Sequence, residues 1–198
     1  MTNYRSESSI GARIKAARRQ RGYRTARELA AAMPGSNVTA ATLENIESGR
    51  KVELTVSQLL NIARVLNIPP SFLLAPMGTP DAKLDLPNLD DSFEDMSAAE
   101  FDSWLTATPM GGYRSAVATE RTDIDQLNAL RELLALRREA RRLQTVLEVQ
   151  SEAGDPDLQT AAPVTESRLA AVLSEARHLE DLLQAAGWTV EPGSEPGS

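Results

Sequence analysis

Apolar residues between positions 8 and 75 recur at the three- and four-residue spacing of amphipathic helices. A serine or threonine that can cap a helix stands near the start of each apolar run, and a glycine or proline follows its end. This part of the chain is therefore expected to form a domain of short helices. The pattern predicts helices over 10–21, 26–33, 39–48 and 57–67, with a last turn over 71–74.

The second and third of these helices are joined by an extended turn. Thr25 caps the second helix, and Glu28 completes a capping box three residues later. Thr39 caps the third helix, and Gly49 ends it. Between the two helices, the run Pro34-Gly-Ser-Asn37 breaks the helical pattern.

The C-terminal part of the chain carries a longer apolar repeat. Two stretches, 122–151 and 165–186, begin with the capping residues Thr122 and Thr165, and their apolar residues alternate between spacings of three and four. We expect residues 122–187 to form an α-helical hairpin with a coiled-coil seam. One such hairpin has a thin core, so dimerisation into a four-helix bundle would bury the rest. The alternative is a monomeric hairpin packed on its own N-terminal domain. The residues assigned to the dimer interface are Leu133, Leu136, Leu143, Leu147, Leu169, Val172, Leu179 and Leu183.

The remaining segments are less regular. Four prolines, a Gly-Gly pair and scattered acids within 76–113 indicate that residues 76–121 form a mostly irregular, acidic connector. Inside it, Ser97 and Glu100 form a capping box, which predicts a short helix whose aromatic residues need a surface to pack on. The low-complexity tail 188–198 is expected to be disordered. The predicted fold is all-α throughout.

The charge of the chain is strongly asymmetric. The net charge is −7, but residues 1–75 hold eleven basic and five acidic residues. Residues 76–113 hold one lysine and eight acids, and residues 114–198 hold nine arginines and fifteen acids. Because phosphate contacts dominate the affinity of nucleic-acid binders, a basic N-terminal domain on an acidic body favours nucleic-acid binding.

Composition excludes several kinds of chemistry. The chain has no cysteine, so it has no disulfide and no thiolate zinc site, and its one histidine, His178, is interpreted as a solvated or interface residue. No phosphate-binding loop, zinc-protease motif or nucleophile elbow occurs. No apolar run is long enough to span a membrane, and the N-terminus lacks the apolar region of a secretory signal. We expect a cytoplasmic protein that is not an enzyme and uses no metal or cofactor.

One motif in the N-terminal domain resembles a known family. The run Thr42-Leu-Glu-Asn-Ile-Glu-Ser-Gly-Arg50 follows a short capped helix, and Glu28-Leu-Ala30 lies upstream. Together with Ile10-Gly-Ala-Arg-Ile14, Arg18 and the apolar run from Leu60 to Ile68, these residues resemble the Cro/cI-type helix-turn-helix domain of the XRE family. The resemblance covers the N-terminal domain alone. It implies a five-helix, lambda-repressor-like domain whose partner is double-stranded DNA.

In such a domain the helix at 39–48 enters the major groove, with its N-terminal residues at base edges. Leu43 and Ile46 face inward. On the opposite face, Asn45 can pair bidentately with adenine, a glutamate can accept from cytosine, and methyl groups can contact thymine. The face has few long donors, so we expect modest specificity for each half-site and reliance on a dimer. The candidate base-reading residues are Ala40, Ala41, Thr42, Glu44 and Asn45.

Other residues are expected to hold the DNA backbone or the domain itself. Thr39 stands at a helix N-terminus, which favours anions. The resemblance implies that Arg50 and Lys51 contact phosphates after the recognition helix, and that Arg18 and Glu47 form a partly buried structural ion pair. The full set of candidate phosphate contacts is Arg24, Arg27, Thr39, Arg50 and Lys51, with Arg13 as a further candidate.

The sequence departs from the family pattern at two places. Ala26 stands where the family often has a glutamine that contacts phosphate, so Arg24 or Arg27 is expected to replace that contact. The turn from Pro34 to Asn37 is longer than the compact turn of the family, which affects the angle between the two helices of the motif.

The leading hypothesis is a homodimeric, sequence-specific repressor, encoded by a bacterium or a phage, that binds an inverted-repeat operator. The alternative is an antitoxin or co-regulator whose C-terminal helices bind a partner protein. A further hypothesis, compatible with both, is that the acidic connector folds over the basic N-terminal domain and restrains it.

Overall fold

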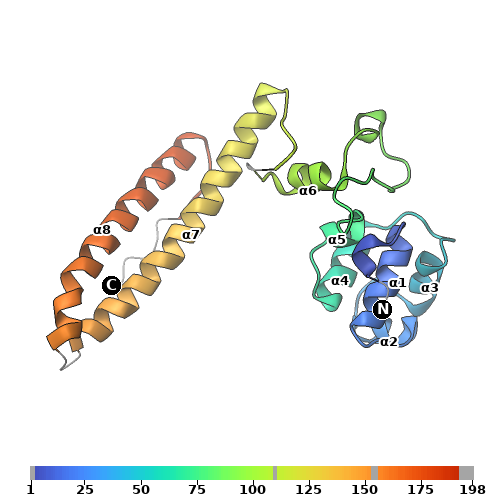
Figure 1. The fold of residues 1–198 in the computed structure, drawn as a ribbon, viewed down its shortest axis with the longest axis horizontal. Coiled ribbons are helices and arrows are strands. Elements are labelled where there is room, and N and C mark those ends of the chain that lie inside the picture. Colours follow the sequence, from blue (N-terminus) through green and yellow to red (C-terminus); the bar gives the residue numbers. More distant parts are fainter. Residues whose placement is uncertain (1–2, 109–110, 153–155, 192–198) are drawn as a thin grey trace. The chain divides into compact units, whose positions relative to one another are not determined.

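The structure is a computed structural model that describes residues 3–108, 111–152 and 156–191. These ranges contain eight α-helices and two short 3₁₀ segments, so the prediction of an all-α fold is confirmed (Figure 1). Within them no β-strand occurs, and one isolated bridge joins Lys83 and Ser97. The chain divides into two compact units; the first contains the residues up to Thr106 and a short segment that ends at Arg114, and the second contains most of the chain from Ser115. In the described ranges, no helix combines the length and apolar character that a membrane span requires.

The first unit begins with five helices, as the sequence predicts. Hydroxyl side chains cap the first four, each accepting a hydrogen bond from the backbone N–H three residues later. The fourth helix begins one residue before the predicted Ser57, because Thr55 and Gln58 form a capping box. The helices are α1 (Ile10–Gln20), α2 (Ala26–Ala31), α3 (Ala40–Glu47), α4 (Val56–Leu66) and α5 (Ser71–Leu74).

A single aliphatic core holds these five helices together. At its edge, α1 and α3 approach so closely that a Cβ atom on Gly11 would lie 2.2 Å from the carbonyl oxygen of Ile46. Glycine is therefore required at this position of α1 by the packing of α3. The largest fully buried apolar residues of the core are Ile14, Leu29, Leu43, Ile46, Ile62, Leu66 and Leu73.

Residues 76–106 of the acidic connector belong to the first unit and pack on its helices. The backbone N–H of Gly78 donates to the carbonyl oxygen of Arg5 at 2.8 Å, and Leu86 packs against the aliphatic core. The connector contains a 3₁₀ segment (Asp91–Phe93) and helix α6 (Ala98–Thr106). Phe101 is buried, and the Phe93 and Trp104 rings meet edge to face with centroids 5.3 Å apart. The aromatic residues of the expected short helix therefore pack on their neighbours in this unit.

The second unit is an antiparallel hairpin of α7 (Ala118–Glu152) and α8 (Pro156–Ala185), which lie side by side in Figure 1. Its seam is buried at Leu133, Ala140 and Leu143 on α7 and at Ala176, Leu179 and Leu183 on α8. Ion pairs flank the seam on both sides. Arg137 pairs with Glu180 at 2.7 Å, and Glu139 pairs with Arg168 at 2.9 Å.

Both hairpin helices begin earlier than the capping threonines predict. The hydroxyl of Thr122 donates to the carbonyl oxygen of Ala118, and that of Thr165 donates to Ala161, so each lies inside its helix. A threonine hydroxyl can make either a cap or this backward bond, which is why the predicted helix starts are wrong. Helix α8 continues through Pro163, although this residue has no backbone donor.

The packed part of the hairpin also extends past Gly187. The indole N–H of Trp188 donates to the side-chain oxygen of Gln126 on α7 at 2.8 Å, and Val190 packs against the seam. Arg137 reaches the carbonyl oxygen of Glu191. Residues 188–191 therefore pack against α7, although the low-complexity composition predicted disorder for residues 188–198.

Candidate nucleic-acid interface

Helices α2 and α3 carry the candidate recognition surface, and local hydrogen bonds fix the start of each. The Thr25 hydroxyl accepts from the N–H of Glu28 at 3.1 Å, and the Glu28 carboxylate reaches back to the N–H of Arg24 at 2.6 Å. At the start of α3, the Thr39 hydroxyl accepts from the N–H of Thr42 at 3.1 Å. These bonds satisfy backbone donors that a helix leaves unpaired in its first turn.

The long turn between α2 and α3 is anchored at three points. Met33 and Val38 are buried at its two ends, and Gly35 takes the positive φ of 76° that the turn needs. At its far side, the Asn37 amide donates to the hydroxyl of Ser57 at 3.0 Å, in the first turn of α4. No local sequence pattern indicates this link. This hydrogen bond fixes the turn, and therefore the start of α3, to α4.

The outer face of α3 carries the predicted base-reading residues. Leu43 and Ile46 are buried in the core, Ala41 and Glu44 are exposed, and Asn45 is half-buried. Ala40 and Thr42 are also half-buried, and the Thr42 hydroxyl lies 2.9 Å from that of Thr39. The exposed part of this face is therefore made of short side chains, a single carboxylate and one amide.

Basic side chains flank this face. Arg24 and Arg27, at the start of α2, are exposed, and so is Arg50 after α3. The Arg50 guanidinium donates to the hydroxyl of Ser48 at 3.1 Å. Lys51 makes two hydrogen bonds: its backbone N–H donates to the carbonyl oxygen of Asn45, and its ammonium group donates to the side-chain oxygen of Gln58 at 2.9 Å. Thr39 is exposed beside its cap.

Arg18 and Glu47 form a bidentate ion pair between α1 and α3. The two N···O distances are 2.6 and 2.8 Å, and the side chains are only 5% and 8% exposed. The third guanidinium nitrogen of Arg18 donates to the carbonyl oxygen of Tyr23. The hydrogen bonds with Glu47 hold the pKa of Arg18 above its ordinary value. Removing one partner would leave a buried charge, at a cost of about 3–5 kcal/mol.

Arg13 was a further candidate for phosphate binding, and that prediction is wrong. Its side chain is fully buried and binds both carboxylate oxygens of Asp85, at 2.6 and 2.7 Å. It also donates to the carbonyl oxygens of Glu7, Leu73 and Leu74. The sequence gives no sign of this role, because Asp85 lies 72 positions away from Arg13.

Comparison with family models identifies this arrangement. The model described as Helix-turn-helix matches residues 14–73, which span α1 to α5 almost completely. The first unit carries a helix-turn-helix domain of the XRE type. No curated protein and no solved structure matches the chain. The match supports a DNA-binding transcription regulator of this type, and the members of the matched family are DNA-binding regulators rather than enzymes.

The matched region of this XRE-type regulator ends before the connector and the hairpin, so the hairpin is interpreted from its own residues. Four of the eight residues assigned to a dimer interface, Leu133, Leu143, Leu179 and Leu183, are already buried within one hairpin. The other four, Leu136, Leu147, Leu169 and Val172, are half-buried. The first four need no second chain to leave solvent.

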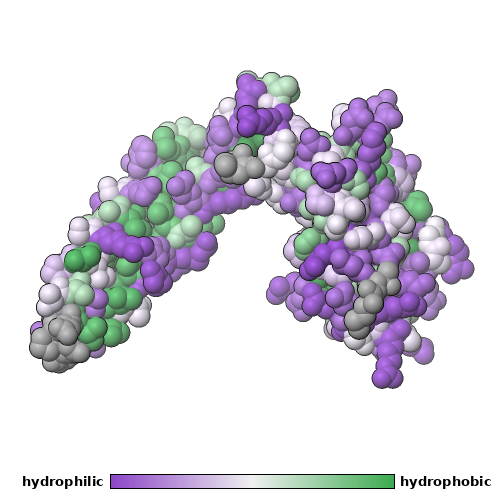
Figure 2. Space-filling model, viewed as in Figure 1, coloured by the Kyte–Doolittle hydropathy of each residue, from purple (hydrophilic) through white to green (hydrophobic). Residues whose placement is uncertain are grey.

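Six large apolar residues of α7 and α8 are exposed; Leu134 and Leu182 lie along the hairpin, and the other four lie toward the end of α7 and the start of α8. Val146 and Val149, in the last turns of α7, are 36% and 58% exposed. Leu158 and Val164, in the first turns of α8, are 41% and 73% exposed. Figure 2 shows apolar side chains at this end of the hairpin. We refer to these four residues as the hairpin-tip patch.

Proposed function

We propose that this XRE-type regulator is a sequence-specific repressor that binds an inverted-repeat operator as a homodimer. The observation that carries the proposal is the solvent-exposed outer face of α3, flanked by Arg24, Arg27 and Arg50, inside a matched helix-turn-helix domain. A domain of this kind reads bases from the N-terminal part of its second motif helix.

The residues of this face suggest how sequence is read. Asn45 would pair with an adenine through its amide, and the methyl groups of Ala40, Ala41 and Thr42 would contact thymine. Glu44 would accept a hydrogen bond from a cytosine amino group, because it would otherwise repel nearby phosphates. Phosphate contacts from Arg24, Arg27, Thr39, Arg50 and Lys51 would then set the position of α3.

The hairpin-tip patch supports dimerisation. Exposed apolar patches on soluble proteins mark interaction sites. Four of the six exposed large aliphatic residues of the hairpin helices lie in the last turns of α7 and the first turns of α8, while Leu133, Leu143, Leu179 and Leu183 are already buried within a single chain. A second hairpin that packs on this patch would bring two recognition helices to one operator, and dimer symmetry would match an inverted repeat.

Selection of bound sites from random duplex DNA, followed by binding measurements on the selected site, tests the proposal. Asn45→Ala should lose roughly 1–3 kcal/mol on the selected site and relax specificity at one base pair. Arg50→Ala should weaken binding on all sequences and lower the salt slope by about one unit. Arg64→Ala, which removes an exposed charge from the far end of α4, is the matched control and should leave both quantities unchanged.

Two results would contradict the proposal. One is the recovery of no enriched sequence by the selection. The other is binding by the Asn45 and Arg50 variants that equals that of Arg64→Ala, because the recognition face would then be elsewhere. A parent chain that is monomeric and binds an unrelated protein through its hairpin would instead favour an antitoxin or co-regulator.

A further inference from the structure

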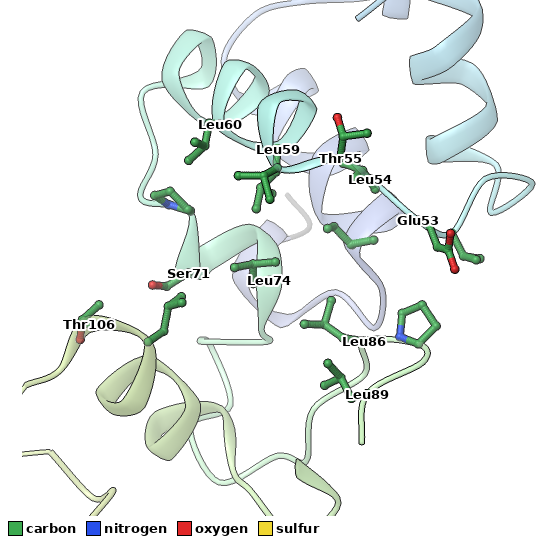
Figure 3. Close-up of a pocket in the computed structure, with 16 residues that line it drawn as sticks. Glu53, Leu54, Thr55, Leu59, Leu60, Ser71, Leu74, Leu86, Leu89 and Thr106 are labelled. Atoms are coloured by element: carbon green, nitrogen blue, oxygen red, sulfur yellow. The ribbon is translucent and has the colours of Figure 1, made fainter. Parts of the chain in front are cut away.

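A groove in the first unit lies between the helix-turn-helix domain and the connector. It has a volume of about 640 Å³ and 16 lining residues. One wall is the segment from Val52 to Leu60, which enters α4, and Ile10 and residues of α5 also line the groove. The opposite wall contains Leu86 and Leu89 of the connector. Figure 3 shows Leu59 and Leu60 of α4 on the side facing Leu74, Leu86 and Leu89.

The groove gathers the large apolar residues that this unit exposes. The described part of the first unit has five exposed large aliphatic residues, and all five line the groove. A soluble domain normally scatters such residues singly, and a contiguous group indicates a binding surface. The five are Val52 (51% exposed), Val56 (73%), Leu60 (49%), Leu89 (39%) and Leu105 (43%).

The polar groups of the groove restrict the charge of what it can hold. Its single ionisable lining residue is Glu53, whose carboxylate accepts from the amide of Asn88 at 2.9 Å, and no arginine or lysine lines it. Hydroxyls of Thr55, Ser71 and Thr106 are the other side-chain polar groups. An anionic ligand would meet a like charge and no cation. We propose that this groove binds a small, hydrocarbon-rich molecule that is neutral or positively charged.

The size of the groove favours a small molecule over a second copy of the chain. Pockets that hold small ligands have volumes of about 300–1,000 Å³ and mainly apolar walls with a few polar groups. A stable protein interface uses about 20–30 residues from each partner, which is more than the groove provides. The groove therefore matches a ligand of ordinary small-molecule size.

Occupancy of the groove should also affect DNA binding, a step that rests on the proposed function. Val52, Leu54 and Val56 follow directly after Arg50 and Lys51, the candidate phosphate contacts. A ligand that packs on this segment would hold the segment in its present conformation, in which Lys51 donates a hydrogen bond to Gln58 and Arg50 is exposed. We expect occupancy to tighten DNA binding by about fivefold, the lower end of the usual range for coupled sites.

Three probes with the same ten-carbon chain test the groove in the full-length chain without DNA. Decylamine is cationic, 1-decanol is neutral and decanoate is anionic. We expect saturable one-to-one binding of the first two, with shifts of the Leu60, Leu89 and Leu105 methyl NMR signals. Decanoate should bind about tenfold more weakly because of Glu53. Glu53→Gln should remove most of that difference between amine and carboxylate.

A pair of matched variants locates the bound probe. Leu60→Trp fills the groove at a residue that is 49% exposed, and Leu182→Trp adds the same bulk at a residue of α8 that is 51% exposed. Leu60→Trp should weaken decylamine and 1-decanol by about tenfold or more, since several methylene contacts are lost. Leu182→Trp should bind both probes like the parent.

Several outcomes would overturn the proposal. One is the absence of saturable binding of both decylamine and 1-decanol. Another is binding of decanoate that is as tight as that of the other two probes. A third is an unchanged affinity of Leu60→Trp for decylamine and 1-decanol. Methyl signals of the groove that move with protein concentration alone would assign it to a second copy of the chain instead. The coupling is tested by measuring DNA affinity with and without 1-decanol. Binding of 1-decanol that leaves the DNA affinity unchanged would overturn the coupling alone. Failure of DNA binding in every condition would overturn the proposed function but not the groove.

Discussion

The guanidinium of Arg13 on α1 is bound by both carboxylate oxygens of Asp85 in the connector, at 2.6 and 2.7 Å, and the arginine side chain has no solvent exposure. The helix-turn-helix domain thus places a positive charge in its interior, and the connector supplies the counter-charge. This contact makes the connector a structural part of the first unit, although it lies outside the residues that match the family model.

Asp85→Ala should therefore destabilise the first unit. It would leave the Arg13 charge buried with three carbonyl acceptors, so we expect a loss of about 3 kcal/mol, the lower end of the range for a broken buried pair. Urea unfolding followed at the Ile14 and Ile46 methyl NMR signals measures this loss of unfolding free energy.

Asp95→Ala is the matched control from the same connector. Its pair with Lys83 is exposed, so its loss should stay below about 1 kcal/mol. Equal effects of the two variants would contradict this assignment.

Gly11→Ala should separate α1 from α3. The added methyl group would meet the Ile46 carbonyl oxygen at 2.2 Å, and because this atom belongs to the backbone, one helix must shift. Overpacking of this kind costs about 1–3 kcal/mol, even though alanine is the better helix former. We expect weaker DNA binding as well, because α3 carries the recognition face. The added methyl group of Gly112→Ala would contact only the flexible Cγ of Glu100. This variant is the control and should change neither the free energy of unfolding nor the DNA affinity. A stabilised Gly11→Ala variant would show that the helices are less tightly held than the structure indicates.

The start of α6 should depend on pH through Glu100. Its carboxylate accepts from the backbone N–H and the hydroxyl of Ser97, and these bonds hold the pKa of Glu100 below its ordinary value. A carboxylate with a depressed pKa stabilises the fold at any pH above its unfolded value, and that stabilisation disappears as the pH falls through the folded pKa. An NMR titration should show the depressed pKa, and Ser97→Ala should raise it. Ser92→Ala, in the same connector, should leave the Glu100 titration unchanged; a shift there would point to a general loosening.

The hairpin-tip patch makes the proposed dimer testable. Val149→Glu should convert a dimeric chain to monomers, because it places a charge where apolar residues of two hairpins would meet. Val117→Glu introduces the same change at a residue of nearly equal exposure, 56% against 58%, before the start of α7. Sedimentation equilibrium distinguishes the two variants. The monomeric variant should also lose the affinity advantage of an inverted repeat over a single half-site. A Val149→Glu chain that stays dimeric would place the interface elsewhere.

Much of the fold follows from local sequence signals. Thr25 and Thr39 cap the helices they were expected to cap, because a cap depends on residues within one turn. Where a threonine has a second local option, the same reasoning fails, as at Thr122 and Thr165. The candidate site is also partly local. The exposure of Ala41, Glu44 and Arg50 follows from the helical period of α3 and from its end before Gly49.

The sequence by itself determined the all-α fold, the helix-turn-helix domain and the heptad seams, because period and capping are encoded within a few residues. Only the tertiary structure decided which charges and apolar residues are available for binding. It removed Arg13 from the DNA-binding set by pairing it with Asp85, and it buried Leu133 and Leu183 within one hairpin. It also gathered Leu60, Leu89 and Leu105 into one groove. These outcomes depend on contacts between residues far apart in the chain, and no local pattern specifies such contacts.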